Sequence, residues 1–278
     1  MEAAWRAEFG HHAFLRACAL DVEVRKPGNV SLASPGHGMH AGLFLASAAA
    51  AGVAISAAGR PVGERIEAAV RASWCASGCN TNLGIVLLCA PLLAAFERGG
   101  AGTLRDALAS VLQSLDVQDA CAAYRAIALA RPGGLGRAPE QDVDAAPTVG
   151  LREAMALAAH RDRIAWQYVH GYPDVFELAL PAFLGARDPA RAMQAAFLEL
   201  LATRPDSHIV RKHGAAMAQS VMAQAQPWRE RSDRGERLEA DPAFARWDQD
   251  LKAAGVNPGT SADLCVATAM ASELLAAA

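Results

Sequence analysis

The sequence is poor in the residues that build β-sheets. Aromatic side chains make up 6% of its 278 residues, β-branched residues are sparse, and roughly a quarter of the chain is alanine. Alanine is the strongest helix former, whereas β-branched and aromatic residues favour strands. Hydrophobic residues reach 53% and charged residues 20%, which excludes a disordered chain. The composition therefore predicts a folded, all-α protein.

A basic tail and runs of lysine or arginine are also missing. The chain has 26 lysine and arginine residues against 29 aspartate and glutamate residues, a net charge of −3. Proteins that follow the phosphates of DNA or RNA need a basic face. We therefore expect no nucleic-acid partner.

The signatures of the common nucleotide-binding and hydrolytic folds are absent as well. The sequence contains no GxGxxG fingerprint, no P-loop, no GxSxG nucleophile elbow and no HExxH zinc motif. The glycine cluster at 133–136 is typical of a plain loop. Any chemistry must therefore come from other polar residues.

The cysteines form no CxxC pair, and the charged N-terminus does not resemble a secretory signal. We predict free, mostly buried thiols and a cytoplasmic location. The six cysteines are Cys18, Cys75, Cys79, Cys89, Cys121 and Cys265.

The longest apolar stretch, residues 41–58, nearly reaches the length of a membrane span. It is mostly alanine and contains Ser47 and Ser56. Alanine enters a membrane less favourably than leucine or isoleucine does. We therefore predict a buried core helix and no membrane partner.

Helical periodicity and the placement of glycine and proline predict about eleven helices in a single compact domain, 1–278. No alternation of strands and helices is visible. The first helix covers 2–25, and residues 26–38 follow as a loop. Residues 131–147 form the longest loop, of a length that is usually functional or mobile. Residues 227–242 are highly charged and predict a solvated connection.

An acidic residue falls on the apolar face of the helix predicted over 148–171. At about 100° per residue, Asp162 lies near Leu151, Met155 and Val169. A buried carboxylate must be paired, bind a metal or take part in chemistry. We therefore predict Asp162 as a catalytic and metal-binding residue, with a structural ion pair to another helix as the alternative.

Three loop-to-helix junctions are unusually polar: 26–31 (KPGNVS), 79–84 (CNTNLG) and 257–263 (NPGTSAD). Helix N-termini offer free N–H groups that suit phosphate. Ordinary caps are the alternative, since Thr260 and Asp263 have the spacing of a capping box. Three such junctions together predict a shared polar site. Its candidates are Lys26, Asn29, Asn80, Asn82, Asn257 and Ser261 for binding, and Asp263 for catalysis.

A fourth polar cluster covers 204–214, at the start of a helix predicted over 207–225. Asp206 is either the N-cap of that helix or a second candidate for catalysis and metal binding. Arg211, Lys212 and His213 place three basic groups on two successive turns. Such density suits a polyphosphate or carboxylate ligand, with a solvated helix face as the alternative.

At these motifs the chain resembles the triphosphoribosyl-dephospho-CoA synthase family over almost its whole length. The resemblance rests on EVRKPGNVS, CNTNLGIVLLCAPL, ARPGGLG with PTVGLREAM, PDSHIVRKHG and NPGTSADL, in that order. It implies an all-helical fold. It also implies transfer of a triphosphoribosyl group from ATP, or phosphoribosyl pyrophosphate as donor, to a hydroxyl acceptor such as dephospho-CoA. Mg²⁺ is the cofactor that the resemblance implies.

The chain departs from the lyase-associated members of that family at two motifs. Residues 36–40 carry no acidic side chain, and residues 81–84 lack a histidine and a lysine. This pattern resembles a divergent branch with members in archaea and one-carbon-metabolising bacteria. Alternative functions are ribosyl-phosphate transfer in methanopterin-type cofactor biosynthesis, N-glycosidic hydrolysis, and nucleotide binding without catalysis. Alanine-rich helices also allow a homodimer.

Overall fold

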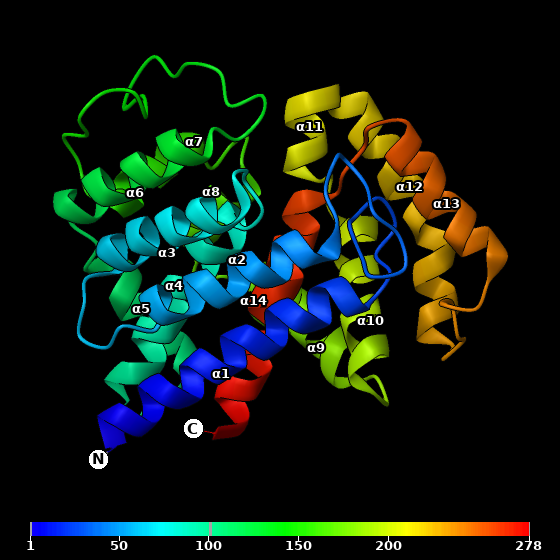
Figure 1. Ribbon diagram of the computed structural model, residues 1–278, viewed down its shortest axis with the longest axis horizontal. Helices are drawn as coiled ribbons and strands as arrows, with labels where there is room; N and C mark the ends of the chain where they lie inside the picture. The colour runs from blue at the N-terminus through cyan, green and yellow to red at the C-terminus, as the bar shows by residue number, and fades with distance from the viewer. Residues whose placement is uncertain (1, 100–101, 278) are drawn as a thin grey trace.

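The computed structural model describes residues 2–99 and 102–277, and helices are its regular elements in these ranges (Figure 1). The all-α prediction is confirmed, with fourteen α-helices and one π-helical segment in the described chain against about eleven helices predicted. In order they are α1 (Glu2–Glu23), α2 (Ala41–Ile55), α3 (Val62–Ser77), α4 (Leu83–Arg98), α5 (Leu104–Gln113), α6 (Val117–Ala130), α7 (Leu151–Ala158), α8 (Arg163–His170), η1 (Asp174–Ala179), α9 (Leu180–Leu184), α10 (Pro189–Thr203), α11 (Ser207–His213), α12 (Ala215–Asp233), α13 (Pro242–Ala253) and α14 (Gly259–Ala277).

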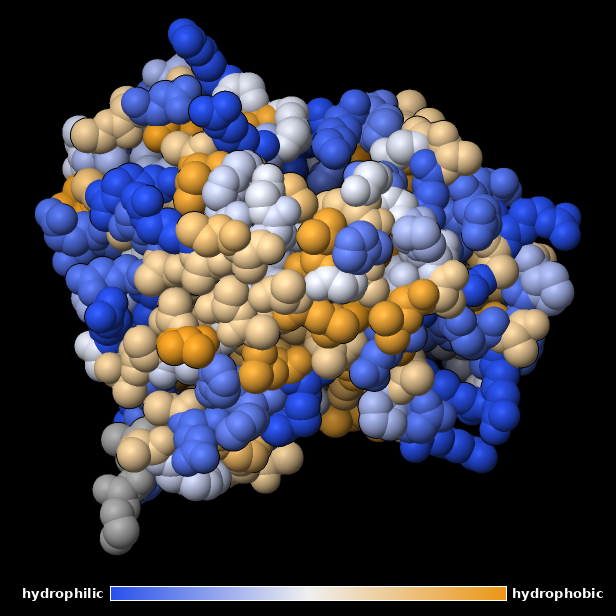
Figure 2. All heavy atoms as spheres, in the orientation of Figure 1, coloured by the Kyte–Doolittle hydropathy of each residue, from blue (hydrophilic) through white to orange (hydrophobic). Residues whose placement is uncertain are grey.

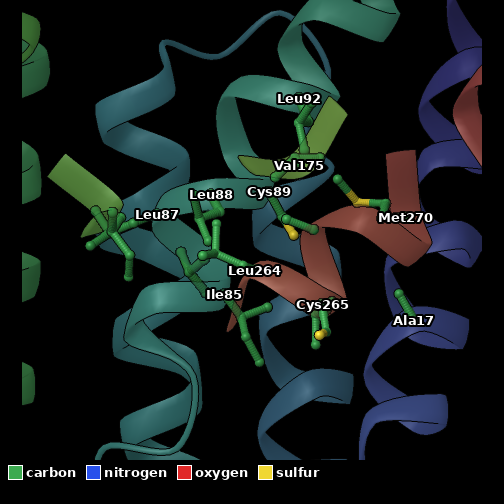
Figure 3. Packing of buried hydrophobic residues seen from close by; sticks show 14 of the residues in the cluster. Ala17, Ile85, Leu87, Leu88, Cys89, Leu92, Val175, Leu264, Cys265 and Met270 are labelled. Carbon is green, nitrogen blue, oxygen red and sulfur yellow. The ribbon is translucent and has the colours of Figure 1, made fainter. Parts of the chain in front are cut away.

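The core is centred on α14, which runs through the middle of the molecule (Figure 1). Apolar residues of α14 occur on every face of the helix, and 12 of its 19 residues are buried. Such a helix belongs inside a protein. Figure 3 shows Cys265 and Met270 of α14 packed among side chains of neighbouring helices, including Cys89 and Val175. The N-terminal ends of α4 and α14 are therefore fixed by a common core.

Helix α4 continues through Pro91 without ending there. Proline has no N–H group, so it leaves the carbonyl of the residue four positions earlier without its helical hydrogen bond. That residue is Leu87, and the Tyr168 hydroxyl donates to its carbonyl at 2.6 Å. The contact satisfies the free carbonyl and ties α8 to α4.

The apolar helix α2 is only half buried, so the prediction of a buried core helix is wrong for its outer face. Ala48, Ala51 and Ile55 point into the core, whereas Leu45 and Val53 are 38% and 72% exposed. Figure 2 shows apolar side chains gathered on the molecular surface over α1 and α2. Among the described helices, none has the length and apolar character needed to cross a membrane.

Two predicted helices are divided in the structure. The segment 148–171 forms α7 and α8, with a turn between them. The segment 207–225 forms α11 and α12, which meet at Gly214 with φ of +86°. Helix α12 then continues to Asp233, so the first part of the predicted solvated connection, 227–242, is helical.

The six cysteines are free, and half of them are buried rather than most. The buried ones are Cys18, Cys89 and Cys265. Burial raises the pKa of each of these thiols, which keeps them protonated. They fill space in the core as small apolar groups.

Candidate functional site

The three polar junctions border a single cavity of about 750 Å³. This volume lies within the range of pockets for small molecules, roughly 300–1,000 Å³. Its wall combines the loop after α1, the N-terminal ends of α4, α8 and α14, residues of α11 and the loop after α6. Eight of the twelve predicted site residues line it: Asn29, Asn80, Asn82, Asp162, Arg211, Lys212, Asn257 and Asp263.

The first and third junctions are joined directly. The Asn29 side-chain amide donates to Asn257 Oδ1 at 2.6 Å. Gly28 has φ of +84°, and a Cβ atom there would lie 2.7 Å from Pro258 Cδ. Only glycine combines this left-handed backbone with so close an approach. The two loops thus form one continuous part of the wall.

The second junction exposes the N-terminus of α4 to the cavity. Asn80 Oδ1 accepts a hydrogen bond from the Leu83 N–H at 3.2 Å, as an ordinary cap does. Asn82 is 5% exposed, and its buried Nδ2 has no hydrogen-bond partner within the described residues. Buried amides are normally paired, so Asn82 has a donor free for a ligand in the cavity.

Asp263 faces the same end of α4. A Cβ atom on Gly84 would lie 1.9 Å from Asp263 Oδ2, so this carboxylate occupies the space that the glycine leaves. Its side chain has no hydrogen bond or ion pair with any described residue. Burial, together with the charges of Asp21, Asp206 and Asp162, holds the pKa of Asp263 well above its usual range. The capping box of Asp263 with Thr260 does not form, because α14 begins at Gly259.

Asp162 lies at the end of the turn between α7 and α8, and the prediction that it sits on the apolar face of one helix is wrong. It is the N-cap of α8, where its Oδ1 accepts from the Ala165 N–H at 3.0 Å. Its Oδ2 lies 3.3 Å from Arg211 Nη1 of α11. The side chain is 29% exposed and lines the cavity. Asp162 therefore forms an ion pair with another helix, which was the alternative to a catalytic role in the sequence analysis.

Four cations also line the cavity: Arg131, Arg161, Arg211 and Lys212. Arg211 Nε donates to the Gly133 carbonyl at 2.8 Å. Gly134, with φ of +77°, approaches the same arginine so closely that a Cβ atom would lie 2.8 Å from Arg211 Cγ. The glycine-rich loop after α6 is therefore packed against α11.

This loop is also bonded within itself. The Tyr124 hydroxyl donates to the Gln141 carbonyl at 2.7 Å, and Gln141 Nε2 donates to Thr148 Oγ1 at 2.8 Å. Asp142 Oδ2 accepts from the Ala138 N–H at 2.6 Å. The loop predicted over 131–147 is present and lines the cavity along much of its length.

Three predicted site residues hold the surrounding elements and lie outside the cavity lining. Asp206 is 3% exposed and caps α11, and its Oδ2 accepts from Ser261 N at 2.7 Å and Ser261 Oγ at 2.8 Å. It therefore ties the N-terminus of α11 to that of α14. His213 Nε2 lies 3.1 Å from the Gly255 carbonyl at the surface.

Lys26, predicted as a binding residue, is the fourth that does not line the cavity. The residue is fully buried, and its ammonium group donates to the Asp21 carbonyl. Lys26 Nζ also lies 3.1 Å from Asp21 Oδ1. A buried ammonium needs such a partner, because isolated charge is costly away from water.

Among the lining residues that the sequence analysis did not select, Asp21 and His208 each have a buried polar atom without a hydrogen-bond partner in the described chain. Asp21 follows the buried Ala17 and Cys18 at spacings of four and three, so helical periodicity alone places it on the buried face of α1. His208 lines the cavity with a buried Nε2 that has no partner in the described chain. Burial and the nearby cations lower the pKa of His208 to about 3, so it is neutral. No spacing rule singles it out.

Fold and site together define a helical protein whose cavity, of a size suited to small molecules, combines carboxylates, cations and neutral amides. The family model for ATP:dephospho-CoA triphosphoribosyl transferase matches residues 8–278, and the chain belongs to that family of transferases.

A solved structure supports the same conclusion. It is a crystal structure from Archaeoglobus fulgidus, provisionally described as a triphosphoribosyl-dephospho-CoA synthase. The two chains share 27% identity with a TM-score of 0.65, over 84% of this chain and 98% of the archaeal one. No curated protein sequence matches the chain. The resemblance noted from the motifs is thereby confirmed.

Proposed function

We propose that the cavity binds ATP and dephospho-CoA side by side and transfers the triphosphoribosyl group between them. One observation carries the proposal: a single cavity brings carboxylates, among them Asp21, Asp162 and Asp263, together with four cations. The reaction requires both kinds of group, because a hydroxyl must be activated while a triphosphate is held. Binding both substrates in one cavity supplies proximity, which is a large part of catalysis.

The triphosphate would lie against the cationic part of the wall. Arg211 is oriented by its bonds to Gly133 and Asp162, and Lys212 follows it on α11. Guanidinium groups pair with phosphate oxygens through two hydrogen bonds, and lysine adds a compact charge. Asn80 and Asn82 would bind ribose or phosphate oxygens at the N-terminus of α4, as would Asn29 and Asn257 nearby.

The wall also has an apolar part, formed by residues such as Phe44, Leu87, Ile127 and Met155. Adenine rings and the pantetheine arm of dephospho-CoA both present apolar surface. Burying that surface contributes about 25 cal/mol per Å². This part of the cavity would therefore bind the bases or the arm, while the polar residues orient the reacting groups.

The carboxylates fit a Mg²⁺ ion that arrives with the triphosphate. In the described chain no group of three or more histidine, cysteine, aspartate or glutamate residues is arranged to hold a metal alone. Mg²⁺ in nucleotide sites needs only one or two carboxylates, since phosphates and water complete its shell. Asp263, which has no described partner, and Asp162 would be its protein ligands. The ion would supply charge neutralisation at the triphosphate.

Removing the two phosphate-binding cations should weaken ATP binding. For Arg211→Gln/Lys212→Gln we expect the KM for ATP to rise at least about 100-fold, because charge-assisted hydrogen bonds contribute about 1.5–3 kcal/mol each and two cations are removed. Arg187→Gln, at an exposed position outside the cavity, should leave the KM unchanged. An unchanged KM in the double variant would show that the triphosphate binds elsewhere.

Release of free adenine from ATP tests the proposed reaction. Purified protein with ATP and Mg²⁺ should release adenine only when dephospho-CoA is added. Adenine release without the acceptor would instead indicate N-glycosidic hydrolysis. Binding of nucleotide with no adenine released under any condition would favour a protein that binds without catalysis. Nothing in the comparisons favours these alternatives or the methanopterin-type pathway.

A further inference from the structure

The end of α1 places a buried ion pair at the wall of the cavity. Asp21 belongs to the last turn of this helix, where backbone carbonyls lack helical partners. The Lys26 ammonium returns from the following loop and donates to the Asp21 carbonyl. The motif lysine therefore caps α1 and is brought against the carboxylate of the residue that it caps.

The pair leaves the carboxylate with free accepting capacity. Lys26 Nζ lies 3.1 Å from Asp21 Oδ1, yet no aligned hydrogen bond reaches that oxygen from the described residues. Asp21 is 4% exposed and belongs to the cavity lining. A carboxylate at the negative end of a helix is unfavourable unless a cation accompanies it. Lys26, which is fully buried, supplies that cation.

Five carboxylates line the cavity, and the three that lie outside the loop after α6 differ in what they can do. Asp162 uses one oxygen to cap α8 and the other to pair with Arg211. Asp263 forms no ion pair with a described cation, although the charge of Arg211 opposes the rise of its pKa. Asp21 alone among these three combines a neighbouring ammonium with oxygens that no described donor occupies. Burial raises the pKa of Asp21 above that of an exposed aspartate, although Lys26 opposes the rise. The raised pKa makes the Asp21 carboxylate a stronger base than an exposed aspartate.

We propose that Asp21 is the catalytic residue that accepts the proton of the attacking hydroxyl, and that Lys26 is the positioning residue that holds it. This inference rests on the proposed function and assigns the general base of that reaction. The acceptor O–H bond breaks, and its proton passes to an Asp21 carboxylate oxygen. The freed oxygen forms a bond to the anomeric carbon of ATP. The bond from that carbon to adenine N9 breaks, its electron pair leaves with adenine, and water protonates the departing base. Asp21 then returns its proton to water.

Kinetics of three variants separate this role from phosphate binding. Asp21→Asn should lower kcat at least about 100-fold, within the usual contribution of a general base, and change the KM for ATP less than about threefold. Lys26→Met should lower kcat too, and Asp21→Asn/Lys26→Met should be no slower than Asp21→Asn. Asp250→Asn, an exposed carboxylate on α13, is the matched control. A Lys26→Met variant with raised KM for ATP and unchanged kcat would overturn the assignment in favour of a phosphate-binding lysine.

Binding of a substrate analogue tests the contact without turnover. By calorimetry, the wild type should bind dephospho-CoA about tenfold more tightly than its 2′-deoxy analogue, as expected for one lost hydrogen bond of about 1.4 kcal/mol. Asp21→Asn should lose this preference. Where that variant does not fold, because Lys26 is left without its partner, the neutral double variant takes its place. Equal affinity of the wild type for both compounds overturns the role of Asp21. A wild type that makes no adduct but keeps the preference would refute the proposed function and still support the contact.

Discussion

Replacing Asp263 with asparagine should abolish turnover and yield a protein at least as stable as the wild type. The carboxylate has no described partner, and burial with three neighbouring acids holds its pKa well above its usual range. Charge held under such conditions lowers stability, and a neutral amide of the same shape removes that cost. If Asp263 binds Mg²⁺ with the triphosphate, kcat should fall at least about 100-fold. Adenine release and thermal unfolding of the same samples measure both effects.

Two further variants isolate the position of the Asp263 carboxylate. Gly84→Ala would place a Cβ atom 1.9 Å from Asp263 Oδ2, so the carboxylate must move, and activity should fall although its charge remains. Asp250→Asn should change neither activity nor unfolding temperature, since it lies exposed on α13. If Asp263→Asn keeps turnover, neither a metal nor a substrate depends on this carboxylate.

Replacing Asp206 with alanine should destabilise the protein by about 3–5 kcal/mol, as expected when several buried donors lose their acceptor. Asp206 accepts from His208 N at 2.9 Å and Ile209 N at 3.1 Å, besides two donors of Ser261. For a chain of this size the loss corresponds to roughly 10 °C in unfolding temperature. Thermal unfolding monitored by circular dichroism measures it.

Asp188→Ala is the matched control for Asp206. Asp188 also caps a helix, α10, through the Arg191 N–H at 3.0 Å, but it lies exposed. We expect its removal to cost about 1 kcal/mol, the usual effect of a lost N-cap. A stable but inactive Asp206→Ala variant would instead support the catalytic or metal-binding role predicted from the sequence.

The helical class of the fold follows from composition, whereas some helix boundaries do not. The break before α8 contains neither glycine nor proline, and apolar residues continue at helical spacing across it. Periodicity therefore placed Asp162 on an apolar face. Local capping decides otherwise, because Asp162 accepts the Ala165 N–H and begins a new helix. The free energies of a continuous helix and of a helix restarted by an N-cap differ by only about 1 kcal/mol. Apolar periodicity alone cannot resolve so small a difference.

The candidate site shows a similar division. The polar junctions could be recognised from the sequence because three of them occur in one chain, and Asn29, Asn82 and Asn257 line one cavity. The burial of Lys26 could not be predicted from the sequence, because it depends on the carboxylate of Asp21, five residues earlier on α1. Lysine is rarely buried unless paired, so an unpaired motif lysine is expected at the surface. Asp21 was overlooked because it lies inside a helix.

The altered motifs at 36–40 and 81–84 lie beside the cavity rather than away from it. His37 Nε2 lies 2.8 Å from the Gly28 carbonyl, so it braces the turn that brings the first and third junctions together. Thr81 Oγ1 donates to Ser47 Oγ at 2.7 Å and fastens the second junction to α2. Both residues line the cavity and support its wall through these contacts.

The most direct test is mass spectrometry of the product formed from ATP, Mg²⁺ and dephospho-CoA. We predict one triphosphoribosyl-dephospho-CoA for every adenine released, with the new bond at the ribose 2′ oxygen and no free ribose triphosphate. The 2′-deoxy analogue of dephospho-CoA should give neither product. Adenine accompanied by ribose triphosphate, or bound nucleotide with no new product, would contradict the assignment of this cavity to triphosphoribosyl transfer.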